Sequence, residues 1–223
     1  MMRAFFFSVI GIGLLVVGGV SRTEAQTINN LFNTGVGAVG AKVTPANTTT
    51  AGLHYTMIAN NFGSGSSTAF VLQSPNGSWA QSADANYLAP DGGDGSGHSG
   101  SYSVTYRTLF TLPANVNLNS VNIAGGWSTD DLGLNILING VSTGLTSPGF
   151  GTFTAFTLPT SSYVVGSNTL DFQWQNQGGP GGLDVRFTSK SFTTPEPGSF
   201  ACLAGMGLAG SVFALRRRFR SPR

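Results

Sequence analysis

Apolar and polar residues alternate over short stretches in the middle of the chain, and clusters of turn residues separate these stretches. The alternation is clearest in residues 101–112, 170–174 and 183–187, and a period of two residues is typical of a strand with one buried face. Between residues 26 and 194 no segment sustains the 3.6-residue period of an amphipathic helix. Eight or more short strands without helices predict an all-β fold, an antiparallel β-sandwich of the jelly-roll type.

Shorter signals predict the remaining strands and turns. Asn139-Gly140 lies between two apolar runs and predicts a hairpin, because both residues accept a positive φ. Residues 91–100 form a glycine-rich loop. Further strands are expected at residues 53–59, 68–73, 116–123, 134–138 and 152–158, after a first apolar, glycine-rich run at residues 35–43.

Two hydrophobic segments at the ends of the chain lie outside this pattern. Residues 4–20 are apolar, follow Arg3 and lead to a small-residue stretch that ends at Ala25, which is the layout of a secretory signal peptide. We therefore predict that signal peptidase removes residues 1–25 and leaves residues 26–194 as one β-domain. An uncleaved N-terminal anchor is the alternative.

The other apolar segment, residues 198–215, holds no charged residue. A helix over residues 199–215 would measure roughly 26 Å, at the short end for a hydrocarbon core of about 30 Å. The basic residues after it are expected to stop membrane transfer and to keep this end in the cytoplasm; they are Arg216, Arg217, Arg218 and Arg220. A buried C-terminal helix of the domain and a membrane anchor that is never processed are the alternatives.

The tripeptide Pro195, Glu196 and Pro197 directly precedes this segment. The tripeptide, the membrane-length helix and the basic end together resemble the PEP-CTERM sorting signal of exported proteins in Gram-negative bacteria. The resemblance implies that residues 195–223 are a sorting region handled by an exosortase, with cleavage near the tripeptide. It also implies passage through the inner membrane and periplasm to the outer surface or the extracellular matrix.

The formal net charge of +2 arises from the two ends rather than from the predicted domain. Residues 26–194 hold four basic and seven acidic residues, a net charge of −3, which gives no support to a nucleic-acid partner. The one cysteine, Cys202, lies in the predicted tail helix. The domain therefore has no disulfide, no thiol nucleophile and no thiolate metal site.

Parts of the domain resemble galactose-binding-like jelly rolls. The resemblance rests on an Asp-Asp pair ahead of a strand that ends in Asn139-Gly140, and on a turn with Asn168 that opens a later strand. Shorter motifs, at residues 31–35, 54–56, 106–108 and 182–185, resemble a domain common in PEP-CTERM exported proteins. The resemblance implies a fold and an envelope setting, and it assigns no ligand.

The Asp-Asp pair is Asp130 and Asp131. Neighbours in a strand point to opposite faces, so these two are not expected to act as a carboxylate pair on one substrate. Their functional interpretation is a contact to Ca²⁺ or to a sugar hydroxyl, and the alternative is that they accept backbone N–H bonds in a turn. Asp91 and Asp94 alternate with glycines, faintly as in a Ca²⁺ loop. A solvated loop is the alternative there, and no cofactor other than this weak calcium candidate is predicted.

Aromatic residues are the other candidates for glycan contact, because the C–H faces of sugars pack on aromatic rings. Trp79 and Tyr87 lie in a polar, loop-rich region and are the better candidates for a place at the surface, with a packed structural role as the alternative. Trp127 is also a candidate for glycan contact, and the alternative is that it packs in the core. Trp174 alternates in phase with neighbouring apolar residues and is expected in the core.

The leading interpretation is a non-catalytic, exported envelope or extracellular-matrix protein that binds exopolysaccharide. The alternative is a purely structural surface or biofilm component without a small ligand. A hydrolase is a weaker alternative, because residues 26–194 contain no glutamate and the two histidines show no metal-binding spacing. Of these, His54 is expected to be packed or hydrogen-bonded.

Overall fold

The computed structural model describes residues 24–44, 50–63, 67–93 and 100–194, and Glu24–Pro195 form one compact unit. Its strands are β1 (Ala25–Thr27), β2 (Ala51–Asn60), β3 (Thr68–Val71), β4 (Leu88–Ala89), β5 (Tyr102–Leu112), β6 (Asn117–Asp130), β7 (Leu132–Ile138), β8 (Val141–Ser142), β9 (Thr154–Thr157), β10 (Gly166–Asn176) and β11 (Gly182–Thr193), and one 3₁₀ turn, η1, spans Thr160–Ser162. The predicted all-β class is confirmed.

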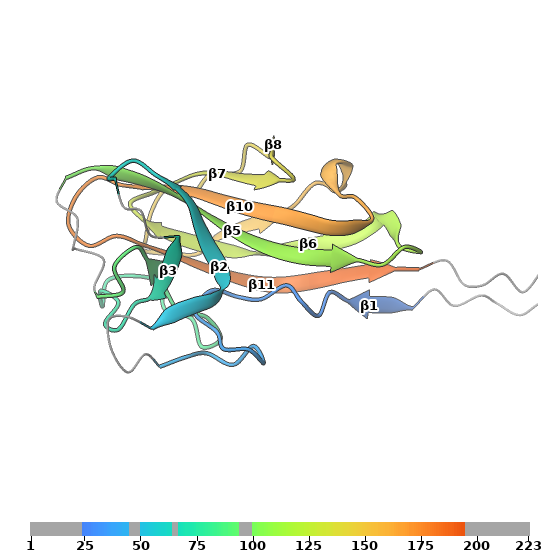
Figure 1. Cartoon of the computed structure of the whole chain (residues 1–223), viewed down its shortest axis with the longest axis horizontal. Coiled ribbons are helices and arrows are strands. Elements are labelled where there is room, and N and C mark those ends of the chain that lie inside the picture. Colours follow the sequence, from blue (N-terminus) through green and yellow to red (C-terminus); the bar gives the residue numbers. More distant parts are fainter. Residues whose placement is uncertain (1–23, 45–49, 64–66, 94–99, 195–223) are drawn as a thin grey trace, which may run out of the picture. The chain divides into compact units, whose positions relative to one another are not determined.

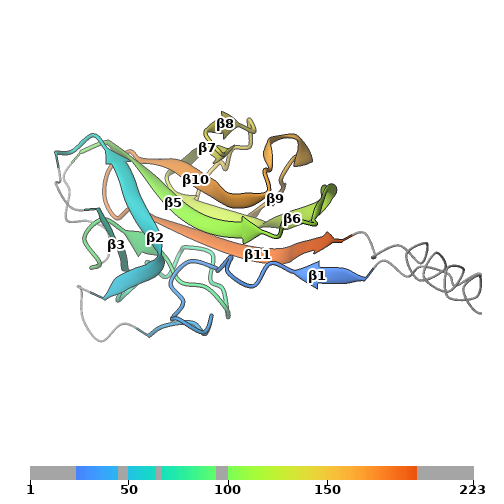
Figure 2. The ribbon, with the colours of Figure 1, turned by 45° about the vertical axis from the view of Figure 1, so that its right-hand side comes forward.

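All the strand pairs are antiparallel, and they join into one curled sheet with the order β8-β7-β10-β5-β2-β3-β4-β11-β6-β9. Strand β1 pairs with β11, so the start and the end of the body lie side by side (Figure 1). Strands β2, β5 and β10 run next to one another along one side of the body (Figure 2).

The pairing of β5 with β10 shows how alternation produces the two faces of the sheet. Eleven consecutive pairs run without a bulge from Gly166↔Leu112 to Asn176↔Tyr102. Every second residue of β5, beginning with Tyr102, is buried, while the residues between them are half-buried or exposed. Because side chains alternate between faces, the residues between the buried ones form an outer face that is open to solvent, and all of them except Leu109 are polar.

The curled sheet closes over a main core that is rich in aromatic side chains. Phe172 of β10 has its ring centroid 5.9 Å from that of Trp127 of β6 and 6.3 Å from that of Phe156 of β9. Trp174, which the sequence places in the core, is fully buried and packs edge-on against Tyr102 at 5.7 Å. Side chains from distant parts of the sheet thus meet in one interior, as in a sandwich.

Strand β6 runs to Asp130, beyond the predicted end at residue 123, and it includes the pair Gly125 and Gly126. A Cβ on Gly125 would collide with the carbonyl oxygen of Arg186 and lie 2.8 Å from the ring of Phe156. Glycine therefore permits a close approach of two strands here and does not mark a turn. The apolar, glycine-rich run at residues 35–43 is described, and it holds an isolated bridge between Val36 and Lys42 in place of a longer strand.

Residues 1–23 of the predicted signal peptide, the sorting tripeptide, the tail helix over residues 199–215 and the four arginines after it lie outside the described residues. Within the described ranges, no helix has both the length and the apolar character needed to cross a membrane.

Candidate ligand-binding groove

Two of the predicted glycan platforms are buried. Trp79 is 3% exposed and Tyr87 is 1% exposed, and their ring centroids are 4.6 Å apart. The hydroxyl of Tyr87 donates to Ser128 Oγ at 2.8 Å. The prediction that these rings lie at the surface is therefore wrong, because they form a small second core with Leu72 and Ala89 beneath the loops.

The predicted separation of Asp130 and Asp131 is also wrong. Asp130 is the last residue of β6 and Asp131 lies between strands, so strand alternation does not apply across them. Their side chains hydrogen-bond to each other, and burial, followed by the hydrogen bond and then the charge of Asp131, raises the pKa of Asp130 well above its usual range. Asp131 Oδ2 accepts a 2.6 Å bond from the backbone N–H of Gln177, which fits the structural interpretation.

The remaining candidates are Trp127 for glycan contact and Asp91 and Asp94 for calcium. Trp127 is fully buried, and so it occupies the core position that was its alternative. Asp91 is described, whereas Asp94 lies outside the described residues. In the described part of the chain, no group of three or more His, Cys, Asp or Glu side chains is arranged to hold a metal ion.

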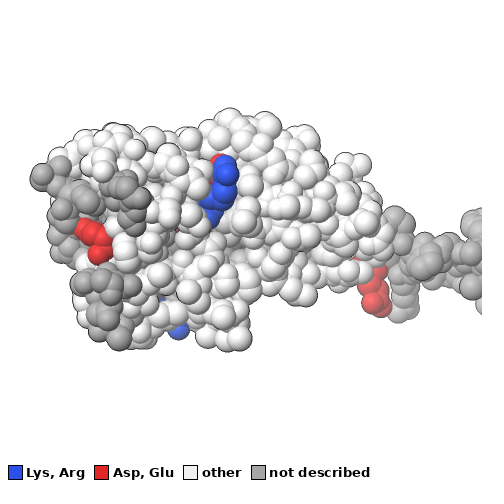
Figure 3. Space-filling view, viewed as in Figure 1, with Lys and Arg blue, Asp and Glu red and all other residues white. Residues whose placement is uncertain are grey.

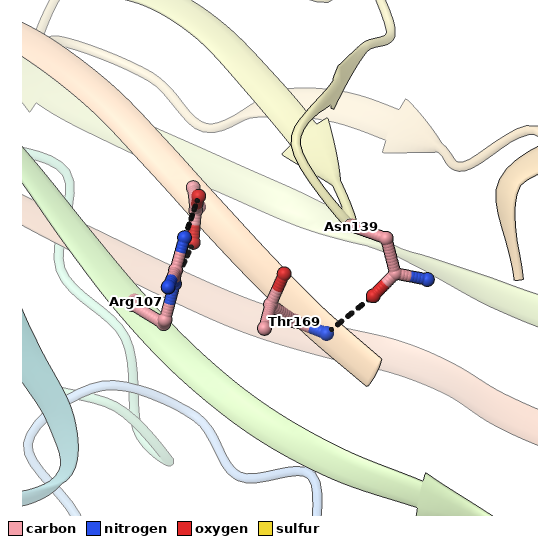
Figure 4. A network of polar contacts seen from close by, with 4 residues as sticks. Arg107, Asn139 and Thr169 are labelled. Carbon is pink, nitrogen blue, oxygen red and sulfur yellow. Dashed lines mark hydrogen bonds and ion pairs between the residues drawn. The ribbon is translucent and has the colours of Figure 1, made fainter. Parts of the chain in front are cut away.

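The two asparagine turns that resemble galactose-binding-like domains meet in space. Asn139 has the positive φ of 51° expected of the hairpin, and its Nδ2 donates to Asn168 Oδ1 at 2.9 Å. Its Oδ1 accepts from the backbone N–H of Thr169 at 2.8 Å (Figure 4). Asn168 is buried and bonds Val164 N–H and C=O. These bonds tie the β7–β8 hairpin to the start of β10 and occupy the side-chain amide groups of both asparagines.

An open groove lies instead on the outer face, along β2 and β5. Its volume is about 390 Å³, within the usual range for small-molecule sites of about 300–1,000 Å³. Its lining residues are Asn30, Leu53, His54, Thr56, Ile58, Arg107 and Leu109. The pattern of the sequence did not single out this groove as a site.

Arg107 supplies the strongest polar group of the groove. Its Nε and Nη2 donate to Oδ1 and Oδ2 of Asp171, both at 2.7 Å (Figure 4). The two residues are direct partners across β5 and β10, so the strand register itself brings them together. The Asp171 side chain is 5% exposed and the Arg107 side chain 36% exposed, which leaves one side of the guanidinium open to solvent. The bonds to Asp171 raise the pKa of Arg107, so it stays charged.

A band of mostly polar residues extends from this ion pair across the sheet. One row of the register runs from Thr56 through Arg107 and Asp171 to Leu137. The next row runs from Thr105 to Gln173 and Asn135. On the face viewed in Figure 3, charged side chains are sparse, and a blue patch near its middle has red directly beside it. The outer face therefore offers hydroxyl and amide groups with little net charge.

Apolar side chains flank the ion pair on the groove side. Leu53, Ile58 and Leu109 are exposed by 63%, 43% and 57% respectively. His54 stacks on Phe32 with ring centroids 3.9 Å apart, and its Nε2 lies 3.0 Å from the carbonyl oxygen of Gly37, as the packed interpretation of His54 predicts. The groove thus combines apolar surface with a few fixed polar groups, which is the usual makeup of a ligand site.

One signal in the sequence could have indicated this groove. Arg107 occupies an outward position in a clearly alternating strand, and it is one of only four basic residues between residues 26 and 194. Its partner Asp171 is likewise the outward acidic residue of an alternating strand. The pairing of the two strands was not predictable, so the two residues could not be joined.

Comparison with known proteins supports the sorting region. The PEP-CTERM protein-sorting motif matches residues 193–218, and the predicted motif is thereby confirmed. The motif implies an exported protein that an exosortase processes. No curated protein matches the chain.

One solved structure similar to the chain is CBM35 from Paenibacillus barcinonensis. The likeness has a TM-score of 0.32 and 13% sequence identity, and it covers 62% of this chain and 94% of that one.

Proposed function

We propose that the chain is a non-catalytic surface or matrix protein whose β-domain binds extracellular polysaccharide in the groove of β2 and β5. The sorting motif supports the exported setting. In this proposal the chain keeps the predicted order of signal peptide, β-domain and sorting region, with signal peptidase and exosortase as its processing partners.

The observation that carries the proposal is the open side of the Arg107–Asp171 pair, set between exposed apolar side chains. Sugars present hydroxyl groups around their rims and C–H groups on their faces. Fixed guanidinium N–H groups match the hydroxyls, while Leu53 and Leu109 match the C–H faces. The neighbouring Thr105 and Gln173 extend the same chemistry along the sheet, as a polymer requires.

A non-catalytic role is supported by the surroundings of the acidic residues. Asp130 is 6% exposed and Asp184 is 1% exposed, so neither carboxyl group faces the groove solvent. Asp171 is held by two bonds from Arg107. A glycosidase needs two carboxyl groups on either side of the scissile bond, and the described lining of the groove offers no such pair.

The test compares two matched leucine variants of the full chain in affinity electrophoresis on a panel of polysaccharides. Leu109→Ser removes apolar surface inside the groove, and Leu134→Ser removes it at a position 42% exposed on β7, outside the groove lining. Losing roughly 1 kcal/mol of apolar contact corresponds to about a fivefold weaker retention. We expect this loss for Leu109→Ser and none for Leu134→Ser.

Equal retention of both variants would place the binding elsewhere on the chain. No retention of the wild-type chain on any polymer would remove glycan binding from the account. The purely structural role would then be the better interpretation, and loss of matrix cohesion on deletion of the protein would support it.

A further inference from the structure

We propose that the groove selects neutral sugars over uronic acids, and that Asp171 sets this selectivity by neutralising Arg107 while holding its guanidinium in place. This inference rests on the proposed function and names the class of polysaccharide that the groove accepts.

The first step is the geometry of the ion pair. Two of the five guanidinium N–H groups of Arg107 are directed to Asp171 at 2.7 Å each, and three remain for a ligand. A fork held by two parallel bonds has a fixed plane. The remaining N–H groups are therefore presented to solvent in a defined direction, which suits adjacent hydroxyl oxygens of a sugar ring.

The second step is the charge of the groove. Among the residues that line it, Arg107 is the one Lys, Arg, Asp or Glu, and Asp171 cancels its charge at hydrogen-bonding distance. A uronate carboxylate bound there would have to approach the Asp171 carboxylate or displace it from the guanidinium. Neutral hydroxyl groups accept from the remaining N–H groups of Arg107 without charge repulsion from Asp171 and without displacing it.

The third step is the surface around the pair. Leu53, Ile58 and Leu109 are all exposed and give the groove apolar walls. The carboxylate of a uronate would lose part of its hydration shell against such walls, which is unfavourable, whereas the C–H face of a neutral sugar packs on them. Charge and apolar surface thus favour the same class of ligand.

The experiment uses one polymer in two chemical forms: polygalacturonate, and the same polymer with its carboxyl groups reduced to primary alcohols. Retention of the full wild-type chain is measured on both. We expect the neutral form to be retained at least about fivefold more strongly, the size of an effect near 1 kcal/mol at a partly exposed charge. This comparison requires no variant and so does not depend on the folding of one.

The Asp171→Asn variant tests the role of the partner. It leaves Arg107 charged and unneutralised, so retention on polygalacturonate should rise about fivefold. The gain should vanish near 1 M salt, where the screening length is about 3 Å. The double variant Arg107→Gln with Asp171→Asn is the matched control and should show no gain, because it restores a neutral groove.

Each other result counts against the inference. If the wild-type chain retains the acidic polymer as well as or better than the neutral one, the selectivity is wrong while glycan binding stands. If Asp171→Asn folds, as its thermal transition shows, and gains no uronate retention, Asp171 does not set the selectivity. If the wild-type chain retains neither form and no other polysaccharide, or if it dimerises through this face, the proposed function fails and the inference fails with it.

Discussion

The stability of the domain should decrease as pH rises from acidic to neutral values, and Asp184 is the residue that tests why. Asp184 lies in β11 and is 1% exposed. Burial is the largest cause that raises its pKa, from 3.8 to about 7. The hydroxyl of Thr34 donates to its Oδ1 at 2.9 Å and partly offsets the effect of burial.

The direction of the pH effect follows from proton binding. Between about pH 4 and about pH 7 the folded chain holds a proton on Asp184 that the unfolded chain has released. The folded state is therefore favoured at low pH, and its advantage is lost as pH rises through this window. A shift of about 3 pH units corresponds to at most about 4 kcal/mol.

The Asp184→Asn variant removes the titration while keeping the oxygen that accepts from Thr34. The free energy of unfolding is measured by urea denaturation of both proteins at about pH 4 and about pH 8. We expect the variant to gain up to about 4 kcal/mol relative to wild type between the two pH values. A difference between variant and wild type that does not change with pH would refute the reasoning, because Asp184 would then be ionised in the folded chain throughout.

The remaining predictions concern packing and turns, each measured as thermal or urea unfolding of the full chain. Gly133→Ala places a Cβ 2.5 Å from the ring of Trp127, and overpacking of this kind should cost about 1–3 kcal/mol; an unchanged midpoint would mean that the ring moves aside freely. Asn139→Ala removes the bonds to Asn168 and Thr169 at a positive φ, so the free energy of unfolding should fall by about 1–3 kcal/mol. A stability equal to wild type would mean that these bonds do not hold the hairpin to β10. Trp79→Phe should lower stability and leave polysaccharide retention unchanged, because the ring is buried and hydrogen-bonds to Asp130; a selective loss of retention would restore Trp79 as a ligand contact.

The strands were predictable where a single residue period dominates. Strand β5 alternates between buried and more exposed residues over all eleven positions, and β10 keeps apolar residues at every second position from Leu170 to Trp174. Their outward and inward faces follow directly from the sequence. The Asn139-Gly140 turn was also predictable, because its signal is a pair of adjacent residues that accept a positive φ.

The candidate site was not predictable in the same way, because it depends on which strands become neighbours. Trp79 and Tyr87 lie in a segment rich in polar residues, yet they are buried under loops that come from far along the chain. Arg107 and Asp171 are separated by 64 residues and meet only through the pairing of β5 with β10. Composition describes the average environment of a segment, whereas burial and ion pairing are set by tertiary contacts.

The most direct test of the central claim is to map where a retained polysaccharide fragment contacts the chain. Amide chemical shifts of the isotope-labelled protein are followed by NMR as the fragment is added. The account predicts that the largest changes fall on groove residues, with Thr56, Arg107 and Leu109 among them. Changes confined to the loops around Trp79 and Asp131, or no changes at a concentration that saturates retention, would contradict it.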